Sequence, residues 1–316
     1  VLVICFAWLL QFAMTIPCIV REKFRLIPGL HFRDPDLRLF ARTTVVTVFT
    51  TSIFLLCYLA DSNTVSAFGS GAVSAVYYAD KLFTPVATTL IYSISVVLFP
   101  KYNLTYSQVN AQEYKRYVGG TVENTLFVIL PFSALFSAFA VPIIHVLFES
   151  GNFNTVSTQM TSSVFAMYAL GMAGFCVLDL INKAYYTMHK TLTPLLINAV
   201  VLALNIALNL VFRSGQSCGL IARTTAVSLT VGGVIALVCF FRDTRGSLRT
   251  GKLLKNLAAA VLTGAAMWGC EALLYRPELS KLLTLLEFCA LGLVGIGLYA
   301  GICWLLRERE ALQTIV

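Results

Sequence analysis

The chain has 316 residues, of which 58% are hydrophobic and only 12% charged, and its mean hydropathy is +0.81. A soluble domain carries roughly 25% charged residues, so this composition excludes an ordinary soluble enzyme, a disordered tail and a secreted disulfide scaffold. The net charge of +8 comes from lysines and arginines in short runs between apolar stretches, a pattern of membrane topology rather than of a nucleic-acid-binding face. The sequence therefore predicts an integral membrane protein that does not bind nucleic acid.

The apolar stretches predict an all-α, polytopic fold. A transmembrane helix needs about 20 mostly apolar residues, and the runs are continuous, without the alternation of a membrane β-barrel. About nine transmembrane helices are expected, over approximately 1–20, 41–60, 71–100, 117–148, 157–186, 191–212, 219–241, 253–275 and 282–306.

The connections between these runs predict the orientation. Most of the 23 lysines and arginines fall in alternate connections, which the positive-inside rule assigns to the cytoplasm. Arg307 and Arg309 follow the last span, so the C-terminus is expected in the cytoplasm. Because residues 1–20 lack the basic n-region of a signal peptide, we interpret them as a helix of a chain whose upstream part is missing.

Catalytic and metal-binding signatures are not found in the sequence. It contains no H-E-x-x-H or Walker A pattern, and its nine cysteines form no C-x-x-C pair. We therefore expect no enzyme and no metal centre of the Cys/His type. Without an ATP site, transport would depend on an ion gradient, the membrane potential or the substrate gradient.

Lys81 is a candidate for anion binding. It lies ten residues into the third predicted span, roughly 15 Å deep at 1.5 Å per residue. Tyr77 shares its face one turn earlier, and Pro85 leaves the Lys81 carbonyl without a helical donor. A cation at this depth suits an anion site in a water-filled cavity; the alternatives are a structural ion pair or a side chain that extends to the interface.

Further polar residues lie inside the predicted spans. Asn205 and Asn209 are one turn apart and share a helix face, which suits either interhelical hydrogen bonding or, together with a carboxylate, a hard cation such as Na⁺. Asp61 ends the second span and is either functional or solvated. Five more acids remain without an assigned partner: Asp80, Glu123, Asp179, Glu271 and Glu287. Gly297 and Gly301 form a G-x-x-x-G pair, expected as a packing face.

A family resemblance emerges from several sequence blocks. The first is residues 61–100, with Asp61, the segment 71–74 (GAVS), YYADKL at 77–82 and LFP at 98–100. Others follow in order: LFESGNF (147–153), YALGMAGF (168–175), AYYTMHKTLTP (184–194), NIALN (205–209) and GLIARTT (219–225). Over about two thirds of its length the chain resembles the MurJ (MviN) lipid II flippases of the multidrug/oligosaccharidyl-lipid/polysaccharide exporter superfamily.

This resemblance implies a domain organisation. The family has two six-helix lobes around a central cavity, followed by two extra helices. On that pattern residues 1–20 are the last helix of the N-terminal lobe and 21–40 a cytoplasmic linker between lobes. Residues 41–241 form the complete C-terminal six-helix lobe, and 242–316 contain two additional transmembrane helices and a short cytoplasmic tail.

The resemblance also implies a function: translocation of lipid II to the outer leaflet of the bacterial cytoplasmic (inner) membrane by alternating access. Lys81 takes the place of a cavity arginine that is essential in family members, and Ser74 that of a cavity serine, so both are expected to bind the pyrophosphate of the substrate in the cavity. Some members have a sodium site, whose positions here are Asp61, Asn205, Asn209, Leu220 (through its carbonyl) and Thr224. The family often has an aspartate at the position of Asn209, so Na⁺ as the coupling ion is less favoured here. No other cofactor is expected.

Other functions remain open at this stage. One is export of another lipid-linked oligosaccharide, or drug/cation antiport, by a different member of the superfamily. Another is an inactive scaffold that docks peptidoglycan-synthesis proteins. A membrane-embedded enzyme would require a cluster of acids or histidines near an aqueous face, which the sequence does not show. The expected partners are lipid II, membrane lipids and cell-wall-synthesis proteins.

Overall fold

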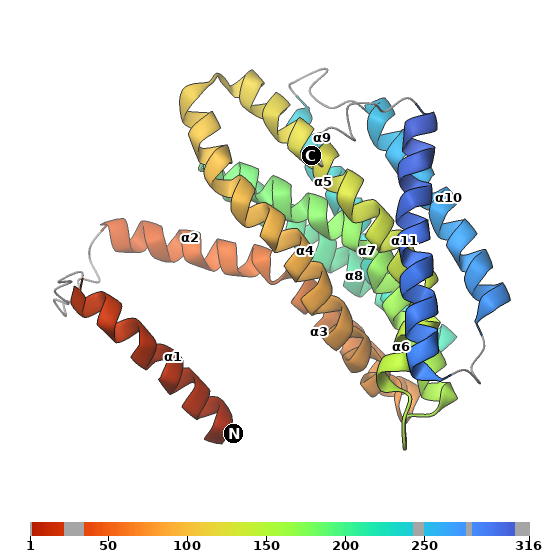
Figure 1. The fold of residues 1–316 in the computed structure, drawn as a ribbon. Coiled ribbons are helices and arrows are strands. Elements are labelled where there is room, and N and C mark those ends of the chain that lie inside the picture. The colour runs from red at the N-terminus through yellow and green to blue at the C-terminus, as the bar shows by residue number, and fades with distance from the viewer. Residues whose placement is uncertain (1, 22–34, 243–249, 276–279, 307–316) are drawn as a thin grey trace. The chain divides into compact units, whose positions relative to one another are not determined.

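The computed structural model describes residues 2–21, 35–242, 250–275 and 280–306, and among these no strand occurs (Figure 1). The chain divides into two compact units, Val1–Thr44 and Val45–Val316. The first unit contains α1 (Leu2–Arg21) and the beginning of α2 (Pro35–Thr51). Residues 22–34 of the predicted linker lie outside the described part, and α2 already begins within its last residues.

The second unit is a helical bundle. Its helices after α2 are α3 (Ile53–Val65), α4 (Ala72–Gln108), α5 (Ala111–Ala138), α6 (Ala140–Phe148), α7 (Thr155–Thr187), α8 (Leu192–Phe212), α9 (Cys218–Phe241), α10 (Thr250–Leu274) and α11 (Lys281–Leu305). Two 3₁₀ turns, Ser66–Phe68 and Arg213–Gly215, follow α3 and α8.

The all-α membrane fold is confirmed, but the number of spans differs from the prediction. Among the described residues, seven helices are long and apolar enough to cross a membrane, or eight if Thr44–Thr51 at the end of α2 and Ile53–Phe68 form one bent span. That pair is bent by 54°, with Ser52 between the two helices. In α1 only the shorter stretch Cys5–Pro17 qualifies as an apolar helix, so nine spans are not confirmed.

Helix α7 forms the centre of the bundle. It packs against α4, α5, α6 and α9, and it has a larger buried share than the other spans. Its closest approach is to α9, where a Cβ on Gly174 would lie 2.7 Å from backbone atoms of Leu229 and Thr230. The small residues of α7 therefore allow the two backbones to touch, as is common between membrane helices.

The predicted glycine packing face on α11 is wrong within the described part of the chain. A Cβ added at Gly297 or Gly301 would meet nothing within 4 Å. The close contact is made instead by Gly295, where a Cβ would lie 2.6 Å from Leu135 of α5 and 3.2 Å from the sulfur of Met267 on α10. The rotation of α11 about its axis selects this glycine, and spacing alone does not reveal it.

Candidate functional site

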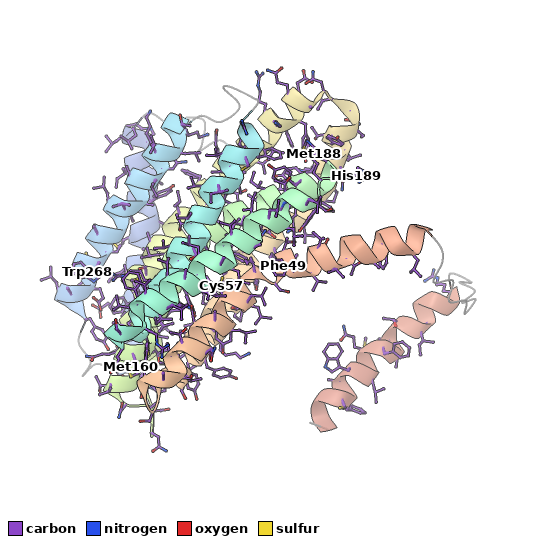
Figure 2. The ribbon with its side chains drawn as sticks, turned by 180° about the vertical axis from the view of Figure 1, so that it is seen from behind. Phe49, Cys57, Met160, Met188, His189 and Trp268 are labelled. Atoms are coloured by element: carbon purple, nitrogen blue, oxygen red, sulfur yellow. The ribbon has the colours of Figure 1, made fainter. Side chains whose placement is uncertain are left out.

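A buried carboxylate lies at the centre of the first candidate site. Asp61 is on α3, and its side chain is fully buried. Its Oδ1 accepts hydrogen bonds from Asn205 (3.2 Å) and Asn209 (2.9 Å), and its Oδ2 accepts from Tyr168 (3.0 Å) and Thr225 (2.6 Å). Cys57, one turn earlier on the same buried face, marks this part of α3 in Figure 2. A carboxylate within a membrane bundle needs such donors, because it is costly to desolvate.

Four helices contribute to this Asp61 network. Asn205 and Asn209 come from α8, Tyr168 from α7, and Thr225 from α9. Thr224 of α9 joins the network through a hydrogen bond to Oδ1 of Asn209. The network thus links α3 to three helices that lie more than 100 residues later in the chain.

The structure brings together four of the five positions that the resemblance suggested for an ion: Asp61, Asn205, Asn209 and Thr224. The fifth, Leu220, lies in the first turn of α9, where its N–H bonds to the Ser217 carbonyl at 3.1 Å. No contact between its carbonyl and the network is recorded for the described residues.

Sequence reasoning missed two members of the network, Tyr168 and Thr225. Both lie within blocks that carry the family resemblance: Thr225 directly follows Thr224, and Tyr168 begins YALGMAGF. Their role depends on how α7 and α9 are rotated toward α3, and a single sequence does not report that rotation.

One oxygen atom of the network is a candidate ligand for a cation. Oδ1 of Asn205 is buried and lacks a hydrogen-bond partner among the described residues. It belongs to the side chain whose Nδ2 bonds to Asp61. Carboxylate, amide and hydroxyl oxygens make up the donor set that hard cations prefer. The described residues contain no group of three or more His, Cys, Asp or Glu side chains that could hold a metal ion.

The second candidate site is an exposed polar face on α4. Ser74, Tyr77, Lys81, Thr89 and Ser93 recur at intervals of three, four or eight residues, and all are exposed. This spacing places them along one face of the helix. A polar stripe on a membrane-spanning helix is typical of a surface that faces water or protein rather than lipid.

Lys81 projects from this α4 face. Its Nζ lies 5.3 Å from the centre of the Tyr77 ring, a cation–π contact. Neither of the ion pairs recorded for the described residues involves Lys81. The neighbouring Asp80 is half-buried and accepts a hydrogen bond from Thr84 at 2.7 Å. The alternative of a structural ion pair for Lys81 therefore finds no support in the described part of the chain.

The structure also gives Asp179 a partner, which the sequence did not. Lys183, one turn later on α7, lies 2.8 Å from Asp179 Oδ2, and Ser95 of α4 bonds to the same oxygen. Nζ of Lys183 lies 5.2 Å from the Tyr92 ring centre. The ion pair lies within α7, and the bond from Ser95 connects it to α4.

A family model and individual relatives point to one family. The family model described as "Lipid II flippase MurJ" matches residues 1–293. The probable lipid II flippase MurJ of Vibrio cholerae is 23% identical over 309 residues, which cover 95% of this chain and 58% of that protein. The probable lipid II flippase MurJ of Buchnera aphidicola from Acyrthosiphon pisum is 26% identical over 213 residues, covering 66% and 42%. The chain thus spans about half the length of these relatives.

A solved structure gives the same picture of the fold. "Lipid II flippase MurJ, inward closed conformation" superposes with a TM-score of 0.70 at 19% sequence identity. The match covers 93% of this chain and 59% of that structure. At this level of identity the match concerns the helical architecture.

Proposed function

The chain belongs to the lipid II flippase MurJ family, and from this membership we propose that it is part of a transporter that moves lipid II from the cytoplasmic to the outer leaflet of the bacterial inner membrane. A transporter needs no catalytic residues, and none are assigned here. The complete activity, its substrate and its orientation belong to this proposal, because the chain spans about half the length of its relatives.

The α4 face is the observation that supports the proposal most directly. It presents a lysine without an ion pair among the described residues, flanked along one helix face by hydroxyl-bearing side chains. Lys81 would bind a pyrophosphate oxygen as a point charge, since an ammonium group lacks the planar fork of arginine. Ser74, seven residues earlier on the same face, would add a hydrogen-bond donor.

The Asp61 network would couple helix movements to the transport cycle. Alternating access requires helices that move as a unit around a site near the middle of the membrane. Hydrogen bonds to one carboxylate hold α3 against α7, α8 and α9. Loosening these bonds would release α3 at the bend that separates it from α2.

A sodium ion fits the same residues. Asp61, Oδ1 of Asn205, the amide oxygen of Asn209 and the hydroxyl of Thr224 supply oxygen ligands of the kind that hard cations prefer, and the unpartnered Oδ1 of Asn205 favours this assignment. When bound, the ion would balance the charge of the carboxylate. Asn209 supplies no second negative charge, so a weak site is expected.

The flippase proposal is tested by lipid II exposure at the outer surface of cells depleted of their own flippase. The protein is expressed from its complete gene as wild type, Lys81→Ala, Lys81→Arg and, as a matched control on the same helix, Lys101→Ala. Wild type, K81R and K101A are expected to restore exposure and K81A to lose it. Normal exposure with K81A at equal membrane levels would contradict the role of Lys81, and no exposure with wild type would contradict the substrate.

The sodium proposal is tested separately by thermal unfolding of the purified protein in NaCl and in KCl. Ligand binding to the native state raises the melting temperature, so wild type is expected to melt higher in sodium and Asp61→Asn to melt equally in both salts. Asn198→Ala removes a buried amide of α8 that hydrogen-bonds to Asn182 and Pro194 outside the network, and this control should keep the sodium effect. Equal melting of wild type in both salts would refute the sodium site.

A further inference from the structure

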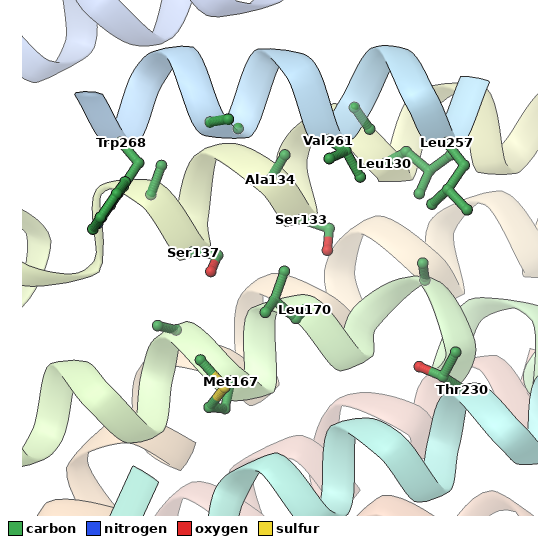
Figure 3. Close-up of a pocket in the computed structure, with 16 residues that line it drawn as sticks. Leu130, Ser133, Ala134, Ser137, Met167, Leu170, Thr230, Leu257, Val261 and Trp268 are labelled. Atoms are coloured by element: carbon green, nitrogen blue, oxygen red, sulfur yellow. The ribbon is translucent and has the colours of Figure 1, made fainter. Parts of the chain in front are cut away.

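An apolar cleft opens on the outside of the bundle beside α10, which packs directly against α5. It has a volume of about 540 Å³ and lies between α10 and helices α5, α7 and α9 (Figure 3). Figure 3 shows Leu257, Val261 and Trp268 along α10, with Leu130 of α5 beside them and Leu170 of α7 on the facing side. Val261 is 62% exposed and Trp268 65%, so the wall formed by α10 remains open to the surroundings, which in a membrane are lipid chains.

The cleft continues into a polar section at the C-terminal end of α10. This second cavity, of about 290 Å³, shares Ser137 and Trp268 with the first and adds Gln159 and Glu271. Glu271 is half-buried, and its carboxylate has no hydrogen bond or ion pair within the described part of the chain. We call the two sections together the α10 groove.

The dimensions of the α10 groove match one leaflet of a bilayer. Fourteen residues separate Leu257 at one end from Glu271 at the other, which is about 21 Å along a helix. Half of a bilayer, headgroups included, measures roughly 20–22 Å. Trp268 stands one turn before Glu271, and tryptophan is enriched at the level of the headgroups. The groove is therefore apolar at the depth of the chains and polar at the depth of the headgroup.

We propose that the α10 groove binds one phospholipid with an amine headgroup, with its ammonium at Glu271 and an acyl chain between α10 and helices α5 and α7. A carboxylate attracts an ammonium and repels a purely anionic headgroup. Ser137 and Gln159 provide polar groups for the phosphate and ester oxygens. A lipid that carries a pyrophosphate would meet the wrong charge, so this site differs from the transport site and does not depend on the proposed function.

The experiment is native mass spectrometry of the protein from its complete gene, released from nanodiscs of phosphatidylethanolamine and phosphatidylglycerol with identical acyl chains in equal amounts. Wild type is expected to retain the ethanolamine lipid roughly fivefold over the glycerol lipid, as befits one charge-assisted contact. Glu271→Gln is expected to bring the ratio close to one. Glu287→Gln, a half-buried acid of α11 outside the groove, should leave the ratio unchanged.

A second pair of variants tests the chain-binding section. Val261→Trp fills the groove and should lower the retention of both lipids, whereas Leu262→Trp, exposed on α10 but outside the groove, should not. Arg276, five residues after Glu271 in the sequence, lies outside the described residues. Arg276→Gln is the control for its charge, and selectivity should persist in this variant. Equal retention of both lipids by wild type, unchanged selectivity in E271Q, lost selectivity in R276Q, or unchanged retention in V261W would each overturn the proposal.

Discussion

Tyr168, in the middle of α7, donates a hydrogen bond of 3.0 Å to Asp61 of α3, a residue 107 positions earlier in the chain. Both side chains are buried, so the central helix of the bundle directly satisfies the one carboxylate of the network. Because α7 also packs against α9 through glycine contacts, it positions Thr225 beside the same carboxylate. The site is therefore a product of how α3, α7 and α9 pack.

Loss of a hydrogen bond to Asp61 should destabilise the bundle. Thr225→Val keeps the shape of the side chain but removes a donor at 2.6 Å from the carboxylate and an acceptor at 2.7 Å from the Asn205 amide. Hydrogen bonds to charged groups contribute about 1.5–3 kcal/mol in water, while bonds between membrane helices average nearer 0.6 kcal/mol, so a cost of about 1–2 kcal/mol is expected. Unfolding by denaturant in detergent measures it.

The matched control for this substitution is Thr230→Val on the same helix. Thr230 is exposed, and its hydroxyl bonds to the Ala226 carbonyl within α9. This change should be nearly neutral. An equal loss of unfolding free energy in both variants would mean that the hydrogen bonds of Thr225 in the Asp61 network do not stabilise the bundle.

Removing only the lysine of the Asp179–Lys183 ion pair in α7 should lower the free energy of unfolding more than removing both charged side chains. Lys183→Met leaves the Asp179 carboxylate, 9% exposed, without its cation, and a loss of about 2–4 kcal/mol in unfolding free energy is expected. The double variant Asp179→Leu/Lys183→Met removes both charges and should recover at least half of that loss. A double-mutant cycle measured by denaturant unfolding reports the coupling; strictly additive effects would argue against a stabilising pair.

Close packing of α7 and α9 should make Gly174 intolerant of a side chain. A Cβ there would lie 2.7 Å from the backbone of α9, so Gly174→Ala forces the helices apart at a cost of about 1–3 kcal/mol. It should also weaken any sodium effect on melting, because the displaced α9 carries Thr224 and Thr225. Gly269→Ala in α10, with nothing within 4 Å of its Cβ, should not lower the melting temperature.

Glu149, in the turn after α6, should make the stability of the folded protein decrease at acidic pH. Partial burial acts to raise the pKa of Glu149, but hydrogen bonds from Thr158, His145 and Thr155 and the charge of His145 outweigh it, so the pKa lies below its ordinary value of 4.5. A lowered pKa in the folded state stabilises the protein above about pH 4.5, and this contribution is lost as the pH falls through the folded pKa.

Melting temperatures measured from about pH 6 down to about pH 3 test this expectation. Glu149→Gln should show a shallower fall in melting temperature over this range than wild type. Glu113→Gln, which removes an exposed carboxylate in the first turn of α5, is the control and should retain the wild-type slope. Identical slopes for E149Q and wild type would rule out this contribution of Glu149.

The sequence alone determined the membrane class and the positions of most spans. Lipid solvates only apolar side chains, and each helix satisfies its own backbone groups, so a run of about 20 apolar residues predicts a span without any knowledge of its neighbours. The same local logic singled out Lys81, Asp61, Asn205 and Asn209, since polar side chains in such runs are rare and conspicuous.

Only the tertiary structure decided which of these residues meet. Tyr168 and Thr225 joined Asp61, Asp179 found Ser95, and Gly295 rather than Gly297 packed against Met267, because each contact depends on the rotation of one helix about its axis and on the helix beside it. The α10 groove has the same origin: its walls come from α5, α6, α7, α9 and α10, and no single stretch of sequence contains both the α10 wall with Glu271 and the surfaces that face it.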